Sequence, residues 1–239
     1  MKDNEQKFSL PLLPEPRTVR ICFHKTGRLQ FISHLDLQRT FARVLVRAGL
    51  PIWYSKGFNP HIKMVFALPL PVGVESECEL LDIRVEREMS DAEILRRLNE
   101  ELTDELRAVA AYPAERKFSE IAFAEYDCEI RSPLIHADAE SAVRSLLEGE
   151  TLPAMKKTKS GEKEINLLDA VLRYAVRAEE GALYLSLTLM SGEGGTVSPE
   201  LVLRTLAARA GILTGDPMRE SYRALRRRLL LSDGVTEFH

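Results

Sequence analysis

The chain has 239 residues, of which 45% are hydrophobic and 29% charged, a composition typical of a globular protein with a buried core. No apolar run approaches the ~20 residues that a membrane-spanning helix needs. The N-terminal residues carry mixed charges and no apolar segment, so we expect no signal peptide and a cytoplasmic location.

Residues 1–16 are polar, contain three prolines and are expected to form a flexible leader. A basic α+β domain is then expected over residues 17–118. Its predicted strands cover residues 19–24, 52–55, 64–68, 80–85 and 109–112. Ser33 and Ser90 are predicted to cap two helices, each with an acidic residue three positions later, and Gly49 is expected to end the first helix.

A second α+β domain is expected over residues 119–239. Strands are predicted at residues 123–131, 170–176 and 183–190, and helices at residues 137–147 and after Ser198. Residues 155–163 are predicted to form a basic hairpin or loop, and residues 222–231 fit a strand or a helix. Because the two halves show similar orders of elements, we expect an α+β fold of two ferredoxin-like halves with antiparallel sheets.

Basic side chains are concentrated in residues 17–63 of this acidic protein. The segment holds nine of the 33 lysines and arginines but only one of the 36 acidic residues, Asp36. An acidic chain with one basic block is expected to hold an anion there, and nucleic acid is the leading candidate.

Arg39, Arg43 and Arg47 recur every four residues, so they form one stripe on the predicted helix. Guanidinium groups about 6 Å apart repel one another modestly, and phosphates would neutralise them. The alternative interpretation is a solvated helix face.

The most distinctive string is SKGFNPH at residues 55–61. Gly57 permits a positive φ, and Asn59 followed by proline indicates a turn. Phe58 offers a stacking ring, Asn59 an amide, and Lys56, His61 and the nearby Lys63 polar or cationic contacts, a combination typical of single-stranded RNA recognition. The alternative is a structured turn whose phenylalanine packs into the core.

Other candidate sites are weaker. His34, Asp36 and His61 could serve an acid–base enzyme, but no nucleophile accompanies them, and a His-x-Asp pair at a helix start favours a cap. The three cysteines lack metal-ligand or cluster spacing, so we expect no metal and no cofactor. The glycines at residues 192–195 lack a phosphate-loop pattern. A second basic cluster either extends the anion surface or solvates a C-terminal element; it comprises Arg223, Arg226, Arg227 and Arg228.

Four motifs resemble a known family: FISHLD at residues 31–36, RAGLP at 47–51, SKGFNPH at 55–61 and FALPLPVGVES at 66–76. They are similar to the radical-SAM-associated family known as domain of unknown function 2344. The resemblance is specific over residues 19–85 and looser to about residue 231, and Ile62 departs from the proline common there. It implies a radical SAM protein as partner and an RNA-related setting, with the radical chemistry on the other chain.

The sequence therefore predicts a non-catalytic accessory or substrate-binding module that works with a radical SAM enzyme and binds tRNA or rRNA. The predicted binding residues are Arg28, Arg39, Arg43, Arg47, Lys56, Phe58, Asn59, His61 and Lys63. One alternative is an RNA-modifying or RNA-processing enzyme that uses His34, Asp36 and His61. Another is a protein-interaction scaffold whose basic face meets an acidic partner.

Overall fold

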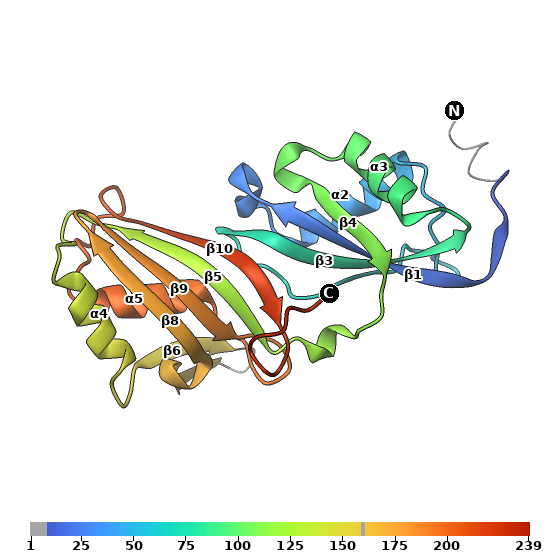
Figure 1. Ribbon diagram of the computed structural model, residues 1–239. Coiled ribbons are helices and arrows are strands. Elements are labelled where there is room, and N and C mark those ends of the chain that lie inside the picture. The colour runs from blue at the N-terminus through green and yellow to red at the C-terminus, as the bar shows by residue number, and fades with distance from the viewer. Residues whose placement is uncertain (1–8, 159–160) are drawn as a thin grey trace. The chain divides into compact units, whose positions relative to one another are not determined.

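The protein is a mixed α+β chain with antiparallel strand pairing, four α-helices in its described part and two compact units. The computed structural model describes residues 9–158 and 161–239. Residues 1–8 of the expected leader, and residues 159 and 160 of the expected basic hairpin, lie outside the described residues. The units are Met1–Phe118 and Ser119–His239 (Figure 1). No helix among the described residues is long and apolar enough to cross a membrane.

The first unit has the element order β-α-β-β-α-β. Its elements are β1 (Leu12–Lys25), α2 (His34–Arg47), β2 (Met64–Phe66), β3 (Val74–Arg87), α3 (Asp91–Glu101) and β4 (Ala108–Pro113). Ile83 of β3 lies opposite Val19 of β1 on one edge and opposite Met64 of β2 on the other. Since β1 also pairs with β4, the strand order is β4-β1-β3-β2, and every pair is antiparallel.

Helices α2 and α3 bury their apolar sides against this sheet. The core joins residues of α2, such as Phe41 and Leu45, to Ile94 and Leu98 of α3 and to alternate residues of β1 and β3. The buried rings of Phe23 and Phe41 lie 4.7 Å apart between centroids, and the half-buried Phe66 packs against them, 5.8 Å from Phe41. The spacing of apolar residues along α2 therefore fixes which side of that helix faces the core.

The second unit repeats this order with one insertion. It contains β5 (Phe123–Arg131), α4 (Ala139–Leu147), β6 (Pro153–Thr158), β7 (Gly161–Asn166), β8 (Val171–Glu179), β9 (Ala182–Met190), α5 (Pro199–Arg209) and β10 (Ser221–Leu230). The strand order is β10-β5-β9-β8. Strands β6 and β7 form a separate two-stranded hairpin inserted between α4 and β8.

The helix starts predicted from capping are confirmed. The hydroxyl oxygens of Ser33, Ser90 and Ser198 accept hydrogen bonds from the backbone N–H groups of Asp36, Glu93 and Leu201. Gly49 follows α2 with a φ of +63°, as its predicted role in ending the helix requires. The segment at residues 222–231, which fitted two interpretations, forms strand β10.

The predicted leader is wrong for residues 12–16, which begin β1. Pro14 and Pro16 are tolerated because they fall between the register positions Leu12 and Arg17, where the pairing with β3 shifts and no proline N–H is needed. Side chains of β3 also hold this segment: Arg87 donates to the carbonyl oxygen of Leu10 at 2.7 Å and Arg84 to that of Pro16 at 3.1 Å. A register shift between Leu12 and Arg17 absorbs the irregularity.

Arg20 occupies a buried position that its place in the basic block does not suggest. Its side chain is 1% exposed and forms a two-pronged ion pair with Asp82, with N–O distances of 2.8 and 2.9 Å. The guanidinium also donates to the carbonyl oxygen of Arg116 and lies 4.3 Å from the ring centroid of Phe118. This arginine therefore holds the end of the first unit against β1 and β3.

Replacement of Asp82 by Ala should lower the free energy of unfolding by about 3–5 kcal/mol, because the Arg20 charge would stay buried without its partner. Chemical denaturation measures this difference. Asp104→Ala is the matched control: its carboxylate is exposed and 3.7 Å from Arg107, so we expect a change of about 1 kcal/mol or less. Equal effects of the two substitutions would contradict the structural role assigned to the Arg20–Asp82 pair.

Candidate nucleic-acid interface

The first turn of α2 is held by a reciprocal bond between Ser33 and Asp36. The Ser33 hydroxyl accepts from the Asp36 backbone N–H at 3.1 Å and donates to the Asp36 carboxylate at 2.7 Å. The hydrogen bond from Ser33 lowers the pKa of Asp36, and the neighbouring Arg39 lowers it further. Asp36 is therefore a first-turn carboxylate that steadies the Ser33 cap.

The three arginines of the predicted stripe are all exposed on α2. Arg39 lies 3.2 Å from Asp36, and Arg47 lies 2.7 Å from Glu101 at the end of α3. Arg43 has no ion-pair partner among the residues that the structure describes. Exposed ion pairs are worth little, about 0–1 kcal/mol, so a phosphate can replace these carboxylates at small cost.

The SKGFNPH loop leaves and rejoins the edge of the first sheet. Ile52 lies opposite Val85 of β3, and Met64 lies opposite Ile83, only two residues further along β3. Residues 53–63 are therefore an excursion from an otherwise continuous edge. We call residues 54–62 the edge loop.

The neck of the edge loop is closed by paired contacts. Tyr54 and Ile62 form a β-bridge, and the Ser55 N–H donates to the His61 carbonyl oxygen at 2.9 Å. The Ser55 hydroxyl accepts from the His61 N–H at 3.1 Å and lies 2.9 Å from the ring nitrogen Nδ1. His61 thus locks the loop.

The tip of the edge loop is fully open to solvent. Phe58 does not pack into the core, because its exposed area equals that of a free side chain (112%). Asn59 is exposed beside it, and Lys56 and Lys63 are exposed on either side of the tip, with no carboxylate within ion-pair distance in the described part of the chain. Gly57 has a φ of +136°, a conformation that side chains rarely adopt.

Helix α2 and the strand that follows the edge loop are neighbours. Phe66 at the end of β2 contacts Phe41 and lies 5.2 Å from the ring of His34, both on α2. The predicted binding residue Arg28 lies in a 3-10 helix (Gly27–Phe31) that leads into α2, and its side chain is exposed.

The structure gives no support to an acid–base site formed by His34, Asp36 and His61. His34 packs on Phe66 and contacts the Gln38 amide at 3.0 Å, Asp36 bonds the capping Ser33, and His61 closes the edge loop. No contact joins the three among the described residues. Within the described part of the chain, no group of three or more His, Cys, Asp or Glu side chains is arranged to hold a metal ion.

Three arginines of the second basic cluster bind residues of the neighbouring strand β5. Arg227 pairs with Asp127 at 2.6 Å and Arg228 with Glu125 at 2.8 Å, across strands β10 and β5. Arg226 is buried and donates to the Tyr126 hydroxyl at 3.2 Å. Of the two interpretations left open, these contacts favour a structural role over an extended anion surface.

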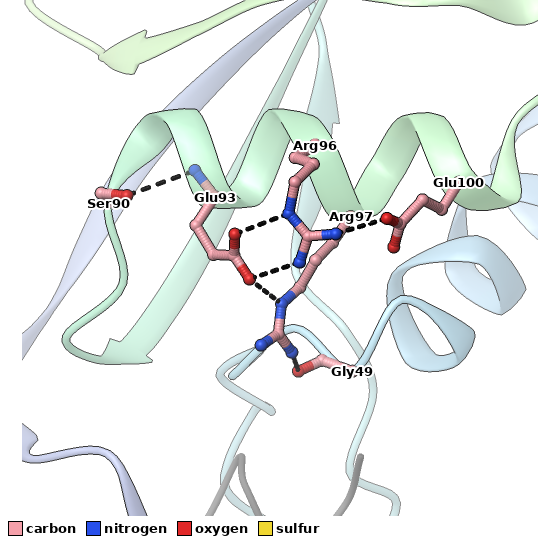
Figure 2. Close-up of polar contacts among 6 residues, drawn as sticks. All are labelled: Gly49, Ser90, Glu93, Arg96, Arg97 and Glu100. Atoms are coloured by element: carbon pink, nitrogen blue, oxygen red, sulfur yellow. Dashed lines mark hydrogen bonds and ion pairs between the residues drawn. The ribbon is translucent and has the colours of Figure 1, made fainter.

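A polar cluster that the sequence analysis missed fastens α3 beside the end of α2 (Figure 2). Glu93 accepts from Arg96 at 2.7 and 2.8 Å and from Arg97 at 2.6 Å. Arg96 also contacts Glu100, and Arg97 reaches the carbonyl oxygen of Gly49 at 3.5 Å. The sequence did contain a signal for this cluster. Arg96 and Arg97 follow Glu93 by three and four positions, and residues with this spacing are neighbours on a helix surface.

A family model described as "Uncharacterized protein conserved in bacteria (DUF2344)" matches residues 18–199. The chain belongs to this DUF2344 family. No curated protein matches it. Among solved structures it is similar to a chain of a Cbf5-Nop10-Gar1 complex, with 10% identity and a TM-score of 0.47, over 88% of this chain and 48% of that chain. A protein of unknown function from Galdieria sulphuraria is similar at 10% identity and a TM-score of 0.26, over 89% and 99%. The chain spans about half the length of the first of these.

The Glu93 cluster should give this DUF2344 member a pH-dependent stability. The bonds from Arg96 and Arg97 lower the pKa of Glu93 from 4.5 to about 2. A lowered pKa means that the contribution is complete above pH 4.5 and is lost as the pH falls through about 2. We expect Glu93→Gln to lower Tm at pH 7 and the difference from wild type to shrink between pH 5 and pH 2.

Melting curves across this pH range test the expectation, with Glu88→Gln as the control. Glu88 is exposed and has no side-chain partner among the described residues, so its replacement should change Tm little at any pH. A difference for Glu93→Gln that stays constant from pH 7 to pH 2 would show that its charge is not involved.

Proposed function

We propose that the protein is a non-catalytic accessory module that binds RNA in the cytoplasm and presents it to a radical SAM enzyme. The observation that carries the RNA-binding part is the edge loop. Its neck is closed by hydrogen bonds, and its fully exposed Phe58 lies between Lys56 and Lys63, which have no ion-pair partner among the described residues. Proteins that bind single-stranded nucleic acid stack unpaired bases on exposed aromatic rings and bind the backbone through neighbouring cations. The radical SAM partner is inferred from the resemblance of the motifs at residues 31–76.

The charges on α2 support the same proposal. Arg43 has no ion-pair partner in the described part of the chain, and Arg39 and Arg47 pair with exposed or half-exposed carboxylates. Three members of the basic block are committed elsewhere, since Arg20 and Lys25 are buried and Arg17 pairs with Asp91. The surface for RNA is therefore smaller than the block, and consists of the α2 stripe, the edge loop, Arg28 and Lys63.

We also infer that the two units are ferredoxin-like domains, residues 17–118 and 119–239. Each has the order β-α-β-β-α-β, and the strand orders β4-β1-β3-β2 and β10-β5-β9-β8 agree position by position. That element order is the ferredoxin-like pattern.

The α2 stripe is tested by the salt dependence of RNA binding. If phosphates bind there, Arg39→Gln, Arg43→Gln and Arg47→Gln together should weaken binding and flatten the plot of log affinity against log salt, by about 0.7 per lost phosphate contact on single strands. Fluorescence anisotropy with labelled single-stranded RNA measures both. The control replaces Arg204, Arg209 and Arg219 of the second unit by Gln. Binding that is absent in the wild type at low salt, or insensitive to the stripe, favours a protein-interaction scaffold.

Phe58→Ala tests the stacking ring. We expect the substitution to cost about 1–3 kcal/mol of binding to single-stranded RNA, the range for one stacked base. Because Phe58 is fully exposed, Tm should stay unchanged. Met218→Ala, at another exposed apolar side chain, is the control. Equal affinities for all three proteins would remove Phe58 from the interface.

Catalysis is tested by product formation on cellular RNA with and without the radical SAM partner. The proposal expects no turnover by the isolated protein. It expects His34→Ala and Asp36→Ala to act through the start of α2, with a loss of about 0.5–2 kcal/mol of stability for the capping carboxylate. Turnover without the partner that either substitution abolishes, with the fold intact, would establish an enzyme instead.

A further inference from the structure

The hairpin β6–β7 occupies the same position in the second unit that the edge loop occupies in the first. In both units a segment is inserted between the first helix and the second strand of the β-α-β-β-α-β order. In the first unit it lies between α2 and β2, and in the second between α4 and β8. The remaining elements follow in the same order, so the two insertions correspond by topology although their sequences differ.

The base of the hairpin is fixed and its outer part is exposed. Leu152 and Leu167, which flank it, are buried, and the Leu167 N–H donates to the Leu152 carbonyl oxygen at 2.9 Å. Asn166 accepts from the Leu152 N–H at 2.8 Å. From Glu162 to Glu164 the side chains are exposed. A hairpin anchored in this way presents its outer residues to solvent without contributing them to the core.

One face of the hairpin carries an unneutralised pair of like charges. Lys156 lies directly opposite Lys163 in the strand register, and like charges at opposed positions destabilise a two-stranded pair. The Lys156 amine donates to the carbonyl oxygen of Thr196 at 2.7 Å. In the described part of the chain, neither lysine has a carboxylate within ion-pair distance.

The acidic residues of the hairpin lie on its other face. Glu162 is opposite Lys157, and Glu164 is opposite Met155. Because opposed residues share a face and successive residues alternate, this face is charge-balanced at Lys157 and acidic at Glu164. The opposite face carries Ala154 and Ile165 near the base of the hairpin and, beyond them, Lys156 and Lys163 as its charged residues in the described part. An anion bound beside the two lysines would relieve their repulsion.

We propose that the hairpin β6–β7 is a second RNA-contacting element, which binds backbone phosphate through Lys163 and Lys156. This inference rests on the proposed RNA binding of the first unit and adds a separate site in the second. The contact is independent of sequence, because the described residues on the face of Lys156 and Lys163 include no aromatic ring or side-chain amide that could read a base. The hairpin therefore contributes affinity and salt dependence, and the edge loop contributes the stacked base.

The experiment is salt-dependent anisotropy of the full chain with labelled single-stranded RNA of mixed sequence. Lys156→Gln with Lys163→Gln should flatten the salt slope by about 1.4, at ~0.7 for each of two lost phosphate contacts. Lys163→Glu, which leaves the Lys156 contact with Thr196 in place, should weaken binding with Tm unchanged. The control is Arg209→Gln with Arg219→Gln, which removes two exposed charges of the same unit and should leave the slope as in wild type.

The outcomes separate the two proposals. If the wild type does not bind RNA at low salt, the proposed function and this inference both fail. If the stripe variant of α2 weakens binding but the lysine variants match the arginine control, the proposed function stands and the hairpin site is overturned. Loss of binding by the lysine variants beyond that of the control supports the hairpin site.

Discussion

The packing of Phe41 against Phe23 and Phe66 is the contact on which the candidate interface depends. It presses α2 onto β1 and β2, and a helix held by one face must present the opposite face to solvent. Arg39, Arg43 and Arg47 are exposed for that reason. The same contact fixes β2, the strand after the edge loop, and therefore the point at which residues 53–63 rejoin the edge of the sheet.

Local signals in the sequence were sufficient to predict the helices and most strands. Ser33, Ser90 and Ser198 mark helix starts by a chemistry that operates within three residues, so no tertiary knowledge is needed. The periodicity of α2 likewise located its exposed arginines. Alternation alone did not decide the segment 222–231, because a register shift after Arg226 breaks it: Arg226 is buried, whereas Arg227 and Arg228 are both exposed. The pairing with β5 makes the segment a strand.

The errors and omissions of the sequence interpretation concern partners that are distant in the chain. Arg20 belongs to the basic block by sequence, but it is buried and Asp82, 62 residues away, neutralises its charge. Residues 1–16 were predicted to be a flexible leader, but Arg84 and Arg87 of β3 donate hydrogen bonds to the carbonyl oxygens of Pro16 and Leu10. The neck of the edge loop depends on the pairing of Ser55 with His61, and the relation of the two insertions becomes visible only when both strand orders are known. The number and spacing of charged residues along the chain do not show which distant residues become partners in the fold.

The central claim is that RNA contacts the α2 stripe and the edge loop. The most direct test is ultraviolet crosslinking in cells, followed by digestion and mass spectrometry of the peptides that carry a nucleotide. The account predicts adducts within residues 39–63, with Phe58 or its neighbours among them. Crosslinked protein without any adduct in that segment, or protein that recovers no RNA, would contradict it.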